Sequence, residues 1–358
     1  ASESRVRPFS VVAVAAGNAL EFYDFIVYAF FAVQIGRTFF PSKDPLTSLL
    51  ASLATSGAGF LMRPIGALVI GRMGDRVGRK PAMILAFALM GLSIAGLALT
   101  PAYAAIGAAA PIAAIGWRLL QGFALGGDVG PSTAFLAEAA PASRRGFYVS
   151  LQIAGQQAAN FAAGTVGLVL SQALSPARVD AWGWRLAFLL GAAVVPLALA
   201  MRRHLPDVHN EAETAQSTAP RSWVPIVLGL TMLAGATTVT YVLSYLTTFA
   251  VTSLHMTGPA GFAATATAGL CGMIGAPIGG WLSDRFGRKP VMLAPAAALL
   301  VCALPVFTLV VRLKSVAALL GGAALLSLCA STGFAVMLCA LVEWLPARQR
   351  SGHRRPVT

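Results

Sequence analysis

The chain has 358 residues, of which 57% are apolar and only 11% are charged. A soluble domain carries about a quarter of its residues as Asp, Glu, Lys or Arg, so this composition excludes a water-soluble enzyme or binding domain. The net charge of +13 does not indicate nucleic-acid binding. The basic residues lie in short loops between apolar runs, where the cytoplasmic loops of membrane proteins carry them.

Apolar runs of roughly 20 residues recur along the whole chain, and such a run can cross the hydrocarbon core of a bilayer. The backbone must satisfy its own hydrogen bonds there, which leaves helices or a closed barrel. The runs are continuous and do not alternate with polar residues, so we predict an all-α membrane protein. Ten spans are predicted at 9–35, 47–71, 81–101, 105–138, 147–174, 184–201, 223–252, 259–283, 290–311 and 315–345.

The first apolar run follows Arg5 and Arg7 and continues unbroken to about Gln34. A first membrane span therefore accounts for this segment better than a cleaved signal peptide. With the N-terminus in the cytoplasm, 18 Lys and Arg residues fall in cytoplasmic segments and 5 in outer loops. This imbalance predicts a multi-pass protein of the inner membrane with a cytoplasmic N-terminus.

The longest polar stretch, 202–222, is the predicted linker between an N-terminal six-helix half, 1–201, and a C-terminal part, 223–358, with four helices. The two parts repeat one another. The segment Gly71–Lys80 recurs as Gly280–Lys289, at an offset of 209 positions. A second set of three residues, found at the end of the fourth span of each part, also recurs at an offset of 205 positions: Glu138, Pro141 and Arg145 match Glu343, Pro346 and Arg350. Parallel repeats of this kind are a known transporter architecture.

These motifs resemble the major facilitator superfamily, and within it the metabolite:proton symporter family. The loop Gly-x-x-x-Asp-Arg-x-Gly-Arg-Lys, the superfamily's most specific signature, occurs here in both parts. The narrower resemblance covers about 9–351 and rests on Gly17–Phe25, Thr38–Pro41, Gly59–Gly66, Arg118–Phe123, Gly146–Tyr148 and Trp182–Arg185. Within the family it is nearest to the citrate and tricarballylate carriers, through Thr38–Pro41 and the paired Gln156 and Gln157. It implies two halves that rock around a central binding site.

The family pattern has twelve spans in two sets of six. The last two are expected after Gly352, where the sequence reads only His353–Thr358, which is too polar to begin a span. We therefore expect a C-terminally truncated form with ten of the usual twelve helices. A frameshift or premature stop near Ser351 is one explanation, and a sequence that merely ends there is the other.

Charged residues inside a membrane are costly unless paired or hydrated, so they indicate function. Arg63 and Arg118 are the only basic residues well inside the predicted helices. Two guanidinium groups facing one cavity would suit a substrate with several carboxylates; alternatively, each pairs with a nearby acid and only holds helices together. Uncharged polar residues at helical spacing suit hydrogen bonds to a solute or between helices. The predicted substrate-binding set is Asn18, Arg63, Arg118, Gln121, Gln152, Gln156, Asn160 and Tyr241.

A buried carboxylate near an arginine can bind and release a proton as the cavity changes access. Glu21, Asp24 and Asp128 are the proton-coupling candidates, and fixed ion pairs are the alternative. Glycines that recur every four residues in the fourth span predict a close helix contact: Gly122, Gly126 and Gly130.

The resemblance implies a gating role for the repeated loops, through Asp75, Arg76, Arg79, Asp284, Arg285 and Arg288. In the superfamily the loop carboxylate sits against a helix N-terminus of the opposite half, where the helix dipole favours negative charge. Asp284 is therefore expected at the fifth span. Asp75 would face an eleventh span, which this sequence does not contain.

The sequence has no nucleophile, metal-ligand or nucleotide motif, so we predict no enzymatic activity, no metal and no cofactor beyond a proton gradient. The prediction is a secondary active transporter, a proton-coupled symporter of a small organic anion, with citrate or a related tricarboxylate or dicarboxylate as the expected substrate. It would work as a monomer in the lipid bilayer, without nucleic acid. The alternatives are a carrier of alpha-ketoglutarate, shikimate, or proline and betaine, and a truncated membrane protein that does not transport.

Overall fold

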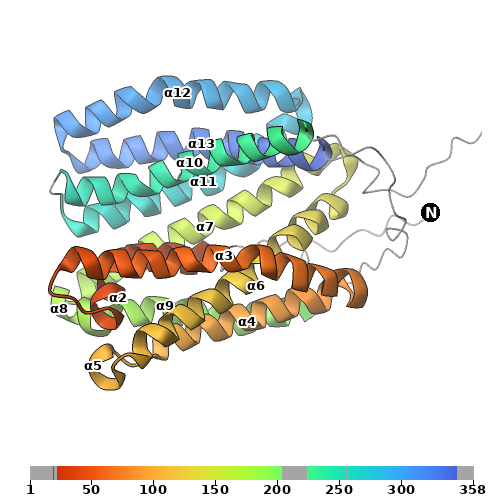
Figure 1. Ribbon diagram of the computed structural model, residues 1–358. Helices are drawn as coiled ribbons and strands as arrows, with labels where there is room; N and C mark the ends of the chain where they lie inside the picture. Colours follow the sequence, from red (N-terminus) through yellow and green to blue (C-terminus); the bar gives the residue numbers. More distant parts are fainter. Residues whose placement is uncertain (1–18, 20–21, 204–223, 255, 345–358) are drawn as a thin grey trace, which may run out of the picture.

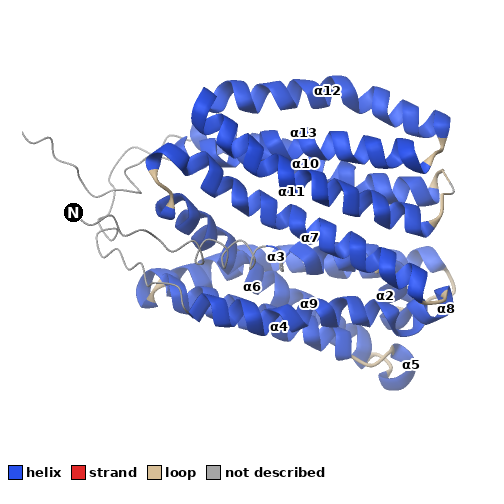
Figure 2. Ribbon diagram, turned by 180° about the vertical axis from the view of Figure 1, so that it is seen from behind, coloured by secondary structure: helices blue, strands red, loops and turns tan. Residues whose placement is uncertain are grey.

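A computed structural model describes residues 19, 22–203, 224–254 and 256–344, and for some residues in these ranges only the backbone. The candidates Asn18 and Glu21 and nearly all of the predicted linker lie outside the described residues. The described part is a bundle of long helices without strands (Figure 2).

In the N-terminal half, residues 22–30 are helical and α2 (Ala32–Phe39) continues after a turn. The long helices that follow are α3 (Pro45–Val77), α4 (Arg79–Leu99), α6 (Ala109–Ala139), α7 (Arg145–Ala173) and α9 (Trp184–Arg203). Short connecting helices are α5 (Tyr103–Ile106) and α8 (Pro176–Arg178). The C-terminal part contains α10 (Val224–Thr252), α11 (Gly258–Phe286), α12 (Arg288–Leu313) and α13 (Val316–Trp344).

Most helix ends fall within two residues of the ends of the predicted spans. Two of the larger differences occur where a glycine ends or interrupts a helix. The second predicted span ends at 71, but α3 continues to Val77, so the signature loop narrows to a tight turn at Gly78. Gly78 and Gly287 have φ of 119° and 88°, backbone that glycine adopts at no steric cost. The fourth predicted span starts at 105, but Gly107, with φ of 55°, separates α5 from α6.

Five of the described helices are apolar and long enough to cross a membrane, judged on length and composition: Pro45–Gly74, Lys80–Leu99, Gly258–Phe286, Arg288–Leu313 and Val316–Leu341. The count of ten spans stays a prediction. In Figure 1, α10, α11, α12 and α13 form one group and α3, α4, α6 and α9 another, with α7 lying between them. Helix α7 therefore carries N-terminal residues to the boundary with the C-terminal part.

Glycines let α3 and α6 pack almost backbone to backbone. A Cβ atom on Gly122 would lie 1.8 Å from the carbonyl oxygen of Gly59, and one on Gly126 would lie 1.9 Å from that of Arg63. These distances are far shorter than van der Waals contact, so no other residue fits without moving a helix. The predicted close contact is confirmed for Gly122 and Gly126, and the surroundings of Gly130 are not described.

Replacement of Gly122 by alanine should therefore destabilise the protein by about 1–3 kcal/mol, the usual cost of overpacking. The measurement is the thermal unfolding midpoint of the purified protein in detergent. Gly116→Ala on the same helix is the matched control, because nothing lies within 4 Å of its added Cβ. That control should be neutral or slightly stabilising, and equal losses in the two variants would contradict the packing argument.

Candidate functional site

A buried ion pair joins the first span to the fourth. The Arg118 Nη1 donates to Asp24 Oδ2 at 2.8 Å, and the two side chains are only 4% and 1% exposed. Gln121, one turn further along α6, accepts from Arg118 and donates to the same Asp24 oxygen. Taking both charges out of water is costly, and removing one partner of such a pair is more costly still. The three residues therefore act as one electrostatic unit.

Aromatic rings enclose this unit. The Arg118 guanidinium carbon lies 3.8 Å from the centre of the Tyr28 ring and 5.8 Å from that of Phe188. The Tyr28 hydroxyl donates to the backbone oxygen of Ser52 on α3 at 2.9 Å. Asp24 Oδ1 and the Arg118 atoms Nε and Nη2 have no hydrogen-bond partner among the described residues. The pair therefore has polar atoms that no described residue satisfies and that are closed off from solvent in this conformation.

A cavity of about 360 Å³ lies between α7 of the N-terminal half and the helices α10–α13 of the C-terminal part. This volume is within the range of sites for small molecules, about 300–1,000 Å³. Its lining is mostly apolar, with Val239, Leu243, Leu299, Phe334 and Met337 among the larger side chains. Among the described lining residues the polar groups are neutral amides, hydroxyls and one thiol: Gln156, Gln157, Asn160, Thr240, Thr265, Ser327, Cys329 and Ser331.

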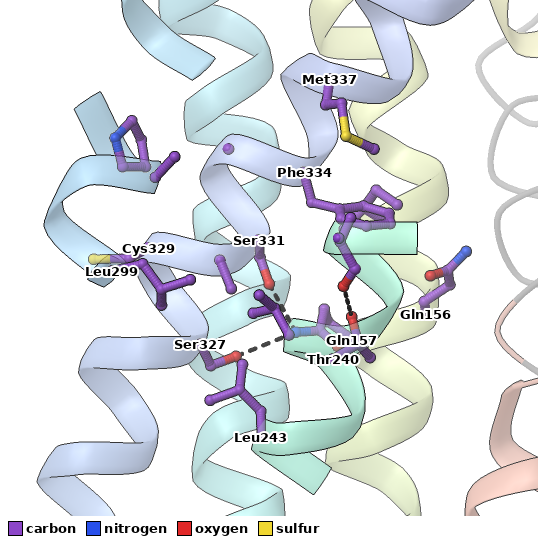
Figure 3. Close-up of a pocket in the computed structure, with 18 of the residues that line it drawn as sticks. Gln156, Gln157, Thr240, Leu243, Leu299, Ser327, Cys329, Ser331, Phe334 and Met337 are labelled. Atoms are coloured by element: carbon purple, nitrogen blue, oxygen red, sulfur yellow. Dashed lines mark hydrogen bonds between the residues drawn. The ribbon is translucent and has the colours of Figure 1, made fainter. Parts of the chain in front are cut away.

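Hydrogen bonds cross from one half to the other at the edge of this cavity (Figure 3). Gln157 Nε2 on α7 donates to Ser331 Oγ at 2.7 Å and to Ser327 Oγ at 3.2 Å, both on α13. Asn160 donates to the Gln157 carbonyl oxygen. The Ser327 hydroxyl donates to the Ala268 backbone oxygen on α11 at 2.6 Å. Three helices from both halves therefore meet in one polar cluster beside the cavity.

The predicted substrate-binding residues divide between these two places. Gln156 and Asn160 line the cavity, whereas Arg118 and Gln121 belong to the buried unit with Asp24. The structure does not bring two guanidinium groups to the cavity. Arg118 is bound to Asp24, and Arg63 lies outside the lining with its guanidinium 4.1 Å from the Phe60 ring. Gln152 is buried on α7 away from the cavity lining, and the Tyr241 side chain lies outside the described residues.

The second signature loop contacts the opposite half at the cytoplasmic end predicted for it. Asp284, near the end of α11, accepts from the backbone N–H groups of Gly146 at 2.8 Å and Phe147 at 2.9 Å. These are among the first N–H groups of α7, which have no partner inside their own helix. The positive end of the helix dipole adds to the attraction. We call this contact, together with Arg288 and Glu343, the inner latch.

Arg288 ties the inner latch to the end of α13. It donates from Nη1 to Asp284 at 2.7 Å and makes a two-pronged pair with Glu343, Nε to Oε2 at 3.1 Å and Nη2 to Oε1 at 2.9 Å. Glu343 lies beyond the apolar span Val316–Leu341. Hydrogen bonds from Arg288 hold the pKa of the Glu343 carboxyl below its ordinary value of 4.5, helped by the charge of nearby Arg145. Glu343 is therefore a stable anion in this network.

The other gating and proton-coupling candidates have fewer described contacts. Arg76 is exposed, and the exposed Arg285 lies 5.7 Å from the Phe286 ring. The side chains of Asp75, Arg79 and Asp128 lie outside the described residues. Within the described residues, no group of three or more His, Cys, Asp or Glu side chains could hold a metal ion.

Sequence reasoning missed Gln157, Ser327 and Ser331 as site residues. The stripe Gln152–Gln156–Asn160 follows a spacing of four, whereas Gln157 pairs with Asn160 at a spacing of three. Both spacings place side chains on one helix face, so the three-residue spacing was the available signal. The two serines of α13 are also four residues apart, but nothing in the sequence alone separates them from ordinary packing residues.

A helical membrane bundle built from two repeats, with a cavity between them and a buried ion pair inside the N-terminal half, belongs to the transporter class of membrane protein. Comparison with known families agrees with this class. The family model of the Major Facilitator Superfamily matches residues 14–276 and 258–353. The chain belongs to this superfamily.

Relatives of the chain carry both charged and zwitterionic metabolites, according to their names. A citrate-proton symporter of Klebsiella pneumoniae is 35% identical over 350 residues, covering 95% of this chain and 79% of the relative. The alpha-ketoglutarate permease of Escherichia coli (strain K12) is 33% identical over 326 residues, covering 88% and 74%. The proline/betaine transporter of the same strain is 31% identical over 322 residues, covering 84% and 64%.

Solved structures share the fold at low identity. The xylose transporter XylE from E. coli, in a partially occluded inward-open conformation, matches with a TM-score of 0.70 and 17% identity, covering 95% of this chain and 85% of that chain. The E. coli fucose:proton symporter FucP matches with a TM-score of 0.61 and 18% identity, covering 95% and 90%. The fold of the superfamily is therefore present in this chain.

Proposed function

We propose that this protein is a proton-coupled symporter of a small organic anion, with citrate or a related tricarboxylate or dicarboxylate as its substrate. The observation that carries the proposal is the Asp24–Arg118 pair, buried between the first and fourth spans, with hydrogen-bonding atoms on both partners that none of the described residues satisfies. The citrate-proton symporters among the relatives of this chain support the proposal, including one from Salmonella typhi that is 36% identical over 306 residues.

Proton coupling follows from the electrostatics of this pair. Protonation of Asp24 cancels its charge, and Arg118 is then a buried cation without a counter-ion, a state that is strongly unfavourable. Arg118 would recover a counter-ion from a second carboxylate of the incoming anion when rocking of the halves opens the buried pair toward the cavity. Proton and anion would therefore each favour binding of the other, which is the thermodynamic requirement for symport.

The cavity gives the solute a place near the boundary of the two halves. Rocking of the halves around such a site exposes it alternately to the two sides of the membrane. The inner latch is the contact that would have to open on the cytoplasmic side, because Asp284 and α7 belong to different halves. The loops with Asp75 and Asp284 are proposed as the gating elements, and Asp24 is proposed as the coupling carboxylate.

The test is uptake of labelled citrate into proteoliposomes with an acidic exterior and the membrane potential clamped at zero. Accumulation of up to about tenfold per coupled proton and pH unit is expected, because one pH unit corresponds to about 1.36 kcal/mol. Uptake of betaine but not citrate would contradict the substrate and favour another carrier of the family. Substrate binding without any flux would favour a membrane protein that does not transport.

A further inference from the structure

A backbone carbonyl fixes the direction of the hydrogen bonds beside the cavity. The Ser327 hydroxyl donates to the Ala268 carbonyl oxygen at 2.6 Å. A carbonyl oxygen can only accept, so the single proton of Ser327 is committed to this bond. The Ser327 oxygen is left as an acceptor for its other neighbour, Gln157.

This direction determines how the Gln157 amide is turned. Its nitrogen must face Ser327 and Ser331, at 3.2 and 2.7 Å, and its carbonyl oxygen must then face Asn160. Turning the amide over would place its oxygen against the Ser327 oxygen, so that two hydrogen-bond acceptors would face each other. Gly272 on α11 makes room for this arrangement, because a Cβ atom there would lie 2.1 Å from the Gln157 nitrogen. The amide therefore has one orientation.

The same logic fixes Asn160 and Ser331, which both line the cavity. Asn160 gives an N–H to the Gln157 carbonyl oxygen, so its own carbonyl oxygen is an acceptor available to a solute. Ser331 accepts from Gln157 and keeps its hydroxyl proton for donation. The cavity therefore presents one hydrogen-bond acceptor, the Asn160 carbonyl oxygen, and one donor, the Ser331 hydroxyl, on either side of Gln157. The hydrogen bonds of Gln157 determine which of the two is the acceptor and which the donor.

We propose that this pair recognises a hydroxy-carboxylate: Asn160 accepts the proton of the substrate's hydroxyl group, and Ser331 donates to an oxygen of its carboxylate. This inference rests on the proposed transport of organic anions and narrows it to acids that carry a hydroxyl group. A solute without a hydroxyl donor leaves the Asn160 oxygen unpaired, and a site built around a hydroxyl discriminates against the analogue that lacks it. Gln157 and Ser327 act as positioning residues, since they orient the groups that touch the solute.

The experiment compares acids that differ by one hydroxyl group, using isothermal titration of the purified protein in lipid nanodiscs. Citrate is compared with tricarballylate, and malate with succinate. The unaltered chain should bind each hydroxylated acid about tenfold more tightly than its partner, the factor expected for one neutral hydrogen bond. Asn160→Ala should abolish this ratio, and Ser327→Ala should reduce it, because the Gln157 amide is then free to turn.

Gln156→Ala is the matched control, because Gln156 also lines the cavity on α7 and, among the described residues, no hydrogen bond links it to the Gln157 cluster. It should weaken binding of hydroxylated and unhydroxylated acids equally. Equal affinities of the unaltered chain for the members of each pair would overturn the hydroxyl inference and leave organic-anion transport standing. Failure to bind any of the four acids would overturn both proposals.

Discussion

Asp24→Asn is expected to abolish proton-driven accumulation of substrate while exchange of substrate across the membrane continues. Asparagine keeps the size of Asp24 but cannot take up a proton, and it leaves Arg118 buried without a counter-ion. Removing one partner of a buried pair costs about 3–5 kcal/mol, so the thermal unfolding midpoint should also fall. The two measurements are labelled-substrate uptake with and without a pH gradient, and thermal unfolding of the purified protein.

The double variant Asp24→Asn with Arg118→Gln separates the two effects. Loss of both charges should restore much of the stability, because neutral replacements for a buried pair are often tolerated, but it should not restore proton coupling. Asp180→Asn serves as the control. Asp180 pairs with Arg37 at 3.0 Å, but the side chains are 41% and 57% exposed, and such pairs contribute at most about 1 kcal/mol. Full proton-driven accumulation by Asp24→Asn would exclude Asp24 as the coupling carboxylate.

Helix positions were predictable from the sequence because apolar length in a membrane chain leaves few alternatives. Several of the differences arose at glycine, where the sequence does not say which backbone conformation is adopted, whereas α2 runs four residues past the predicted end of the first span. Gly78 and Gly287 occupy equivalent positions in the repeated loop, and both have positive φ. Loops of nine residues, 72–80, and six residues, 284–289, were thus expected where a single glycine turn joins two helices. The repeat itself, read from sequence offsets, reappears in these two turns.

The candidate site was less predictable because side-chain pairing depends on which helix faces are brought together. The sequence identified Asp24, Arg118 and Gln121 as functional candidates, but it left open whether Arg118 binds a solute or an acid. The structure pairs Arg118 with Asp24. Gln157 is the opposite case: its partners Ser327 and Ser331 lie 170 and 174 positions away, and no local pattern could connect them.

The inner latch was predictable in part, because its carboxylate lies in a repeated motif. Asp284 was expected at the N-terminus of the fifth span, and it contacts Gly146 and Phe147 there. The part played by Glu343 was not expected. It was recognised as a repeat of Glu138, but its two-pronged pair with Arg288 depends on the end of α13 reaching the start of α12.

Asp284→Ala should open the cytoplasmic end of the boundary between the halves. Two N–H groups of α7 and one N–H of Arg288 lose their charged acceptor, and bonds to charged groups contribute about 1.5–3 kcal/mol each. Cys329 lines the cavity and reports on access to it. Its labelling by a water-soluble maleimide, followed by mass spectrometry, should be at least about tenfold faster in the variant, since 1.4 kcal/mol corresponds to a factor of ten.

Arg285→Ala is the control within the same loop, because Arg285 is exposed and lies beside Trp281 and Phe286, not in the latch. It should leave Cys329 labelling unchanged, and equally fast labelling in both variants would mean that Asp284 does not hold the halves together.

Acid provides an independent test of the inner latch through Glu343, which faces Arg288, Arg145 and Cys339. Because its pKa is lowered in the folded protein, its contribution is complete above 4.5 and is lost as the pH falls through that lower pKa. The measurement is the thermal unfolding midpoint of the unaltered protein and of Glu343→Gln as a function of pH. The difference between the two midpoints should be constant at neutral pH and shrink only in strong acid. A difference that already shrinks between pH 7 and 5 would mean that Arg288 does not stabilise the carboxylate.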